Sequence, residues 1–277
     1  MHCTANDIRE HYDVVSVFYR ALWGDHIHHG YWEGDEPVAQ AQEKLIEKLA
    51  EQAGLRRGMR VLDVGCGVGG SSLWLAQEYD CSVLGITISP VQARMAQAQA
   101  AAKGLARKVS FEVIDANELP FSEETFDLIW IVECIEHLKD KPAFLKACSR
   151  ILSPGGSIAI CSWARGAALV QERDERILAQ ICHGMLLPSL PTIVDYQVWL
   201  HRCSFVDIRA RDVTGFVSRT WDHCLRIVQN PPVRFLVNLS DDRIRDFVGA
   251  FEAMATGYET GSLSYAMITA AWQRAAP

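Results

Sequence analysis

Apolar runs of strand length alternate with amphipathic segments of helix length through the middle of the chain. The pattern predicts strands at 60–64, 81–87, 108–114, 126–132 and 155–162. Helices are predicted between them at 71–79, 89–103 and 139–152. Alternation of this kind favours right-handed crossovers and therefore a parallel sheet with helices on both faces. Two further strands, predicted at 205–213 and 262–272, complete an α/β, Rossmann-like sheet of seven mostly parallel strands.

The segments outside this alternation are predicted to be helical and are rich in aromatic residues. We expect residues 1–55 to form an N-terminal helical lid and 56–163 to form the ligand-binding core. Residues 164–203 are predicted to be a helical lid insertion. Residues 204–277 would complete the core sheet, with a further helical insertion at 219–257. The aromatic side chains of these helices either pack the lid onto the core or line an apolar pocket.

The most informative stretch is residues 60–70, which read Arg-Val-Leu-Asp-Val-Gly-Cys-Gly-Val-Gly-Gly. A short apolar strand here runs through glycines into a helix, so that backbone N–H groups can approach a ligand closely. In an open α/β sheet, ligands bind at the carboxyl ends of such strands. The stretch therefore predicts a site for a cofactor that contains adenosine.

The glycine spacing alone also fits a dinucleotide-binding fingerprint. That fingerprint expects an acidic residue about 20 positions further on, whereas the second predicted strand ends in Thr87-Ile88-Ser89-Pro90. Asp63 lies inside the first strand, and a buried carboxylate needs a hydrogen-bond donor or a positive charge beside it. Loop N–H groups could supply that donor, and so could the ammonium of a cofactor that carries an amino acid. NAD-dependent oxidation is therefore the least favoured hypothesis for the function.

Motifs across residues 60–162 resemble, in order and spacing, those of class I S-adenosylmethionine-dependent methyltransferases. The glycine stretch resembles their motif I, and residues 108–121 resemble their third strand with the Asp-Ala turn after it. Segments 24–32, 85–92 and 135–138 are similar to the tocopherol C-methyltransferase group and its natural-product relatives. The chain departs from that group at residues 130–135, where smaller polar residues are usual, and this puts tocopherol itself in doubt as the acceptor.

This resemblance implies S-adenosyl-L-methionine as the cofactor and assigns roles along the sheet edge. Gly65 and Gly67 would approach the methionine and ribose parts, with Asp63 supporting their loop or contacting the ammonium indirectly. Gln92 would bind a ribose hydroxyl, although it could equally be an exposed helical residue. The remaining residues expected to bind the cofactor are Thr87, Ile88, Asp115, Ala116, Asn117 and Glu133, with Asp115 at the adenine amino group and Glu133 beside the methionine part.

Methyl transfer is an in-line displacement, so the protein mainly positions the acceptor and excludes water. A phenol, sugar hydroxyl or carbon acceptor also needs a base whose pKa lies near 7. His137, with Glu136 adjacent, is our candidate, because a histidine at this point serves as the base in similar sugar O-methyltransferases. A purely structural role for His137 remains an alternative.

His26, His28 and His29 form a second conspicuous cluster. Their spacing matches no zinc site, so we predict no metal. We expect this segment to fold over the cofactor instead, with Tyr31 or Trp32 near the sulfonium through a cation–π contact.

The composition of the chain excludes several further classes of function. The net charge of −7 comes without a basic cluster, which argues against a nucleic-acid partner, and no apolar stretch is long enough to span a membrane. The nine cysteines have no paired metal or redox spacing, and no targeting segment is recognised. We therefore expect a cytoplasmic monomer or homodimer that binds a small-molecule acceptor. The rival hypothesis is a cyclase or cofactor-binding protein of the same fold that does not methylate.

Overall fold

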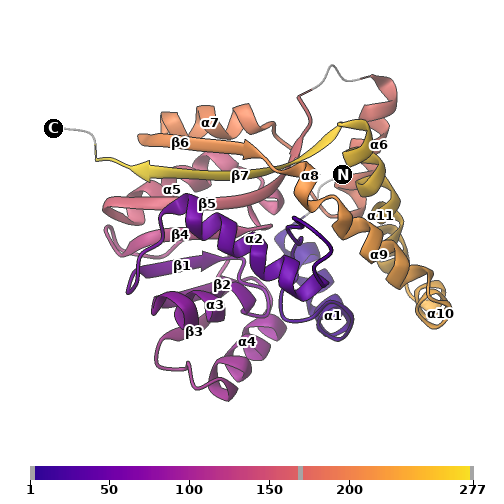
Figure 1. Cartoon of the computed structure of the whole chain (residues 1–277), viewed down its shortest axis with the longest axis horizontal. Helices are drawn as coiled ribbons and strands as arrows, with labels where there is room; N and C mark the ends of the chain where they lie inside the picture. The colour runs from indigo at the N-terminus through magenta and orange to yellow at the C-terminus, as the bar shows by residue number, and fades with distance from the viewer. Residues whose placement is uncertain (1–3, 168–170, 275–277) are drawn as a thin grey trace.

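The computed structural model describes residues 4–167 and 171–274. The ends of the predicted 1–55 and 204–277 segments, and residues 168–170 of the predicted insertion, lie outside the described residues. One seven-stranded sheet forms the centre of the molecule, in the order β3-β2-β1-β4-β5-β7-β6 (Figure 1). Its strands are β1 Arg60–Val64, β2 Ser82–Thr87, β3 Val109–Val113, β4 Phe126–Val132, β5 Leu152–Arg165, β6 Phe205–Asp212 and β7 Leu263–Trp272.

The sheet is parallel except at β7, which pairs antiparallel with both β5 and β6. The predicted seven-stranded, mostly parallel sheet is therefore confirmed. Both boundaries of one predicted strand were wrong, because β5 runs from Leu152 to Arg165 rather than from 155 to 162. The register between β4 and β5 shifts so that Phe126 pairs with Leu152 and Leu128 with Ser157. The Pro-Gly-Gly sequence in this interval is thus an irregularity inside the strand, not a turn before it.

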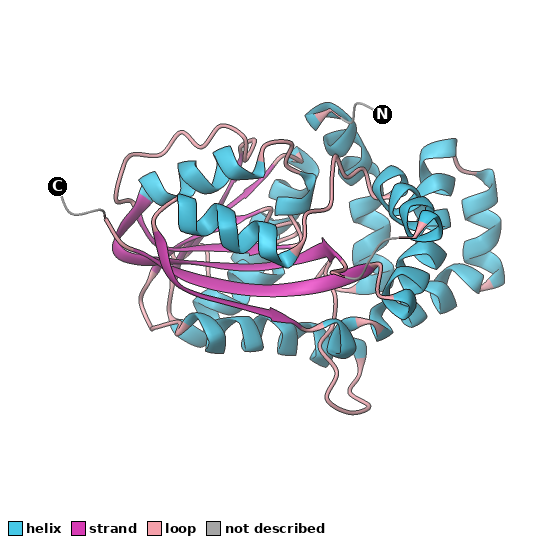
Figure 2. Cartoon of the chain, turned by 90° about the horizontal axis from the view of Figure 1, so that it is seen from above, coloured by secondary structure: helices cyan, strands magenta, loops and turns pink. Residues whose placement is uncertain are grey.

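Helices cover both faces of the sheet (Figure 2). On one face, α2 (Val38–Ala53) and α3 (Gly70–Tyr79) pack in a core with the Trp130 side of β4, and α4 (Pro90–Ala102) contacts β2 and β3. On the other face, α5 (Lys141–Ile151) and α7 (Ile193–Arg202) pack against the Ile129 side. The alternation of apolar residues along β4 thus fills two cores at once.

Further helices gather beyond the carboxyl ends of the parallel strands, at the right in Figure 1. They are α6 (Glu172–Gly184), α8 (Thr214–Val217), α9 (Arg219–Gln229), α10 (Pro231–Leu239) and α11 (Asp242–Thr260). The predicted helical stretch 219–257 is three helices, because Pro231 starts a new helix and Asp241 caps the next. The short α8 was not predicted.

Helix α1 (Ala5–Trp23) also lies at this edge of the sheet. Asp13 accepts a hydrogen bond of 2.5 Å from Ser89, whose backbone precedes α4, and Glu10 pairs with Arg243 of α11. The helix therefore bridges the sheet edge and the appended helices. Among the described residues, no helix is both long and apolar enough to cross a bilayer.

Candidate cofactor and acceptor site

A cavity of about 470 Å³ opens at the carboxyl ends of β1, β2 and β4 and beside the turn after β3. Residues of α1 form its other wall, including Ile8 and Tyr12. The residues expected at the cofactor or the acceptor from the sequence line it, except Asp63, Glu136, Tyr31 and Trp32. Those that do are Gly65, Gly67, Thr87, Ile88, Gln92, Asp115, Ala116, Asn117, Glu133 and His137.

The glycine loop lies at the floor of this cavity, and two of its positions need glycine. Gly65 has a φ of 72°, and a Cβ there would collide with the side chain of Cys134. Gly67 has a φ of 54° with open space around it, so ligand atoms can approach its backbone. The loop is held down because the N–H groups of Gly65 and Cys66 both donate to the carbonyl of Ile86.

Asp63 lies beneath the loop and is 2% exposed. Ser72 of α3 donates a hydrogen bond of 2.5 Å to its Oδ2 atom, which identifies the donor that a buried carboxylate requires. Burial raises the pKa of Asp63 to about 7, and the hydrogen bonds from Ser72 oppose that rise. The side chain lines a small cavity of about 40 Å³ shared with Gly67 and with His26 and His28.

The turn after β2 is a hydrogen-bonded unit at the side of the large cavity. Thr87 Oγ1 donates to Gln92 Oε1 at 2.7 Å, and Gln92 Nε2 donates to Ser16 Oγ of α1 at 3.0 Å. Ser89 caps α4 by accepting a hydrogen bond from the N–H of Gln92. Gln92 is 5% exposed, so it is not a solvated helical residue.

Asp115 and Asn117 form a tight turn after β3. Asp115 Oδ1 accepts from the backbone N–H of Asn117 at 2.9 Å and from its Nδ2 at 2.7 Å. This local pairing fixes the carboxylate at the rim of the cavity. Ile88, which follows β2, and Ala116, which follows β3, contribute apolar wall to the same cavity.

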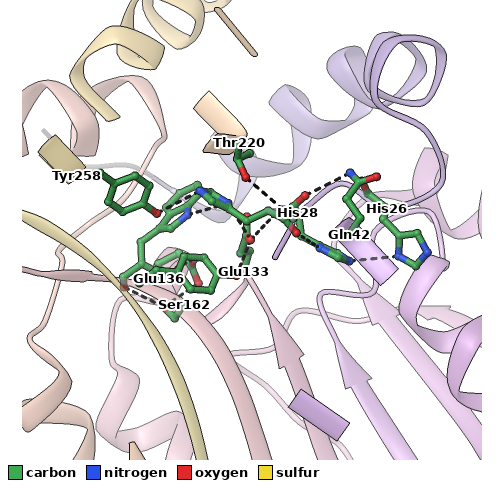
Figure 3. Close-up of polar contacts among 12 residues, drawn as sticks. His26, His28, Gln42, Glu133, Glu136, Ser162, Thr220 and Tyr258 are labelled. Atoms are coloured by element: carbon green, nitrogen blue, oxygen red, sulfur yellow. Dashed lines mark hydrogen bonds and ion pairs between the residues drawn. The ribbon is translucent and has the colours of Figure 1, made fainter. Parts of the chain in front are cut away.

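Glu133 follows β4 in a left-handed conformation with a φ of 52°. Its Oε1 atom accepts hydrogen bonds from the N–H of His29 at 2.8 Å, from His29 Nδ1 at 3.0 Å and from Tyr265 at 2.7 Å (Figure 3). Burial alone would raise the pKa of Glu133, but His29 outweighs it and holds that pKa below its usual range. Tyr258 in turn contacts His29 Nε2 at 3.1 Å.

Glu136 does not line the cavity, although it was expected beside the base. It is fully buried and accepts hydrogen bonds from Ser162 at 3.2 Å and from the N–H of Trp163 at 3.4 Å, both on β5. Burial, with the nearby charge of Glu133, raises the pKa of Glu136 to about 8. The residue is fixed to the sheet because the turn Ile135–His137 directs it inward.

His137 stands at the boundary between the large cavity and a second one. Its Nε2 atom lies 3.1 Å from the hydroxyl of Tyr12, and its Nδ1 lies 3.5 Å from the carbonyl of Leu186. Because a carbonyl can only accept, this geometry favours a proton on Nδ1 and a hydrogen bond from Tyr12 to Nε2. Burial lowers the pKa of His137 to about 4, so the expectation of a base with a pKa near 7 was wrong for this residue.

The second cavity, of about 60 Å³, lies beyond Tyr12 and His137 and is largely apolar. Helices α1, α9 and α11 supply much of its wall. Its lining residues are His11, Tyr12, Ile27, His28, His29, Glu133, His137, Trp163, Met185, Thr220, Trp221, Cys224, Phe247 and Phe251. Of the residues that depart from the tocopherol group, Trp130, Ile131 and Ile135 are fully buried in the cores and do not line either cavity.

Tyr31 and Trp32 lie away from the place expected for the sulfonium. Tyr31 is 3% exposed and stacks on Phe216 with ring centroids 4.5 Å apart. Trp32 stacks on His223 and donates to the carbonyl of Glu36. Neither side chain lines either of these two cavities, because the chain turns from the sheet edge toward α8 and α9 after His29.

His26 and His28 line the small cavity together with the glycine loop, and Figure 3 shows these two imidazoles side by side. His28 Nε2 lies 3.2 Å from His26 Nδ1, and Gln42 of α2 donates to the carbonyl of His26 at 2.5 Å. Burial lowers the pKa of both imidazoles, that of His26 to about 3. Among the described residues, no group of three or more His, Cys, Asp and Glu side chains is arranged to hold a metal ion.

Comparison with known proteins agrees with this geometry. Residues 2–209 match the family model described as mycolic acid cyclopropane synthetase. The chain is 36% identical to the chloroplastic tocopherol O-methyltransferase of Arabidopsis thaliana, over 95% of this chain and 80% of that protein. It is 29% identical to the 27-O-demethylrifamycin SV methyltransferase of Amycolatopsis mediterranei (strain S699), over 96% and 97% of the two chains.

A solved structure, that of the [4+2]-cyclase SpnF, superposes with a TM-score of 0.80 at 26% identity, over 98% of this chain and 97% of that one. The fold, the glycine-floored cavity and these relatives define an S-adenosylmethionine-dependent small-molecule methyltransferase. The chain belongs to the mycolic acid cyclopropane synthetase family.

The sequence did not indicate Tyr12 as a site residue, because a helical pattern does not show which distant residue a side chain will contact. It also missed His29 as the partner of Glu133, although the histidine cluster itself was noticed.

Proposed function

We propose that this methyltransferase acts on a small, mostly apolar acceptor, such as a phenol, an indole or a glycoside of secondary metabolism. The observation that carries the proposal is the Tyr12–His137 pair between the two cavities. One cavity has polar turns and glycines, as an adenosine cofactor requires. The other is walled mainly by aromatic and aliphatic side chains, as a lipophilic acceptor requires.

The cofactor would extend along the carboxyl ends of the strands. Asp115 would accept a hydrogen bond from the adenine amino group, with Ile88 against the purine face. Thr87 and Gln92 would meet the ribose, and this requires Gln92 to exchange a present partner for a ribose hydroxyl. The methionine part would lie over Gly65 and Gly67, above the buried Asp63. Its sulfonium would then lie near Glu133 and Cys134, which face the same cavity as His137.

His137 would receive the acceptor's proton. When a hydroxyl oxygen attacks the methyl carbon, the sulfur–carbon bond breaks and the positive charge passes to the acceptor oxygen. The O–H proton thereby becomes strongly acidic, so a weak base suffices to remove it. His137, with its pKa near 4, is neutral above pH 6 and can take this proton on Nε2. Tyr12 would hold the imidazole in position until the acceptor arrives.

Residues 1–55, 164–203 and 219–257 would together act as the lid over the site. Helix α1 supports this role, since Tyr12, Asp13 and Ser16 bond to His137, Ser89 and Gln92 across the cavity. Closure by these contacts would exclude water from the reacting atoms.

The test is an acceptor screen in which phenols, indoles and glycosides are incubated with S-adenosylmethionine. We expect formation of S-adenosylhomocysteine together with a product heavier by one methyl group. In His137→Ala the turnover should fall about 10²- to 10⁴-fold for hydroxyl acceptors, while affinity for S-adenosylhomocysteine stays within about threefold, because only a group in transition-state contact is removed.

Unchanged turnover of His137→Ala across pH 6–9 would contradict the role of the base. Binding of S-adenosylmethionine with no consumption by any acceptor would favour the alternative, a cyclase that keeps the fold, and the structural likeness to SpnF makes this outcome worth measuring.

A further inference from the structure

His11 is a buried histidine that the mechanism above does not use. It lies on α1, one residue before Tyr12, and its side chain is 5% exposed. Its Nδ1 atom is buried and makes no hydrogen bond to any of the described residues. The residue lines the second cavity, on the acceptor side of the Tyr12–His137 pair.

The surroundings of His11 are apolar on its packed side. Its ring meets Phe247 of α11 edge-on, with centroids 4.9 Å apart, and Met185, Trp221 and Phe251 line the same cavity. Buried polar atoms in proteins are nearly always hydrogen-bonded, because leaving one without a partner is unfavourable. A phenylalanine would make the same edge-on contact without that penalty. The wall of the cavity thus includes a residue whose Nδ1 atom has no hydrogen-bond partner among the described residues.

We propose that His11 determines acceptor specificity, by forming a hydrogen bond through Nδ1 to a hydroxyl group on the part of the acceptor that enters the second cavity. The inference rests on the proposed function, because it requires the acceptor to bind beyond His137. It adds that the acceptor carries a hydroxyl close to the atom that is methylated, or at that atom.

A hydroxyl fits this position better than a carbonyl or an ether does. Burial, followed by the charge of His137, lowers the pKa of His11 to about 4, so the ring is neutral at physiological pH. In a neutral imidazole, Nδ1 either donates or accepts according to the tautomer. A hydroxyl can do both, whereas a carbonyl or an ether only accepts. The hydroxyl therefore satisfies His11 in either state.

Phenol and toluene are matched probes for this inference, since they are of similar size and toluene has a methyl group where phenol has a hydroxyl. Each is titrated by NMR into the protein loaded with S-adenosylhomocysteine, with the side-chain nitrogens of histidine observed through ¹⁵N labelling. In the wild type we expect phenol to bind at least about tenfold more tightly than toluene and to shift the His11 signals. In His11→Phe the preference should fall to about one or reverse.

His201→Phe is the control, because His201 is exposed at the end of α7 and the same chemical change there should leave the preference unaltered. If His11→Phe fails to fold, the His11 shift in the wild type and a His11→Gln variant, which keeps a donor and an acceptor, still decide the matter. Equal affinities for the two probes, no phenol binding to the loaded protein, or an unchanged preference in His11→Phe would overturn the inference. Failure to bind S-adenosylhomocysteine at all would instead contradict the proposed function.

Discussion

We predict that the ionised carboxylate of Asp63 destabilises the folded protein, so that stability falls as the pH rises. Its pKa is about 7 in the folded protein, against 3.8 for an ordinary aspartate, because burial penalises the charged form. When folding raises the pKa of a group, that group contributes its full stabilisation of the native state below its pKa in the unfolded chain. The contribution is lost as the pH rises to its pKa in the folded protein. Wild-type protein should therefore lose stability through this group between about pH 4 and pH 7.

The magnitude follows from linkage. Each pKa unit corresponds to about 1.4 kcal/mol, so ionised Asp63 destabilises the native state by about 4 kcal/mol above pH 7. At pH 5 the same penalty is only about 1.5 kcal/mol. The variant Asp63→Asn keeps an oxygen that can accept from Ser72 and carries no charge. Its stability relative to wild type should thus rise by about 2 to 3 kcal/mol between pH 5 and pH 8.

Urea unfolding of both proteins at pH 5, 6, 7 and 8 measures this difference. Asp127→Asn is the matched control, because the hydrogen bond from Arg60 holds the pKa of Asp127 below its usual range. This carboxyl is therefore ionised in both the folded and the unfolded state from pH 5 to pH 8, and the stability of the variant relative to wild type should not change over that range. A difference between Asp63→Asn and wild type that stays constant from pH 5 to pH 8 would refute the reasoning.

Four other substitutions test the site. Glu133→Gln should lower the free energy of unfolding by about 1.5 to 3 kcal/mol, since three hydrogen bonds lose a charged acceptor. Because the pKa of Glu133 is lowered in the folded protein, this loss of stability relative to wild type should shrink as the pH falls through that pKa. A loss of stability that does not change on acidification would contradict this. Gln92→Leu leaves Thr87 without its acceptor and should weaken S-adenosylhomocysteine binding about tenfold by calorimetry; unaltered affinity would exclude a ribose contact. His137, being neutral throughout, should give wild-type turnover no inflection of its own between pH 6 and pH 9, and His137→Phe should slow turnover at every pH; a wild-type inflection near pH 6.5 that this variant removes would contradict the lowered pKa. Tyr31→Leu should destabilise the fold by about 1 to 3 kcal/mol through lost stacking on Phe216. A large fall in cofactor affinity would instead indicate that Tyr31 contacts the sulfonium, as expected from the sequence.

Local features of the site could be predicted from the sequence because they depend on neighbours along the chain. The positive φ at Gly65 and Gly67, the serine cap before Gln92 and the Asp115–Asn117 turn all arise within a few residues. The sheet was predictable for the same reason, since most of its strands show an apolar run of their own.

Contacts made between distant segments could not be predicted. Tyr12 and His137 are 125 positions apart, and the helical pattern around Tyr12 shows only which face is apolar. Tyr31 was placed at the sulfonium because it follows the histidines, whereas docking of that segment on α8 directs it to Phe216. The Glu136 side chain points inward because of a single turn of 3₁₀ helix after β4, and such a turn has no strong sequence signal.

A crystal structure of the protein with S-adenosylhomocysteine tests the central claim most directly. The account predicts adenine beside Asp115, the ribose at Gln92, and the sulfur facing the Tyr12–His137 pair, with the second cavity open beyond it. A cofactor bound with its sulfur turned away from His137, or bound outside the glycine-floored cavity, would contradict the account.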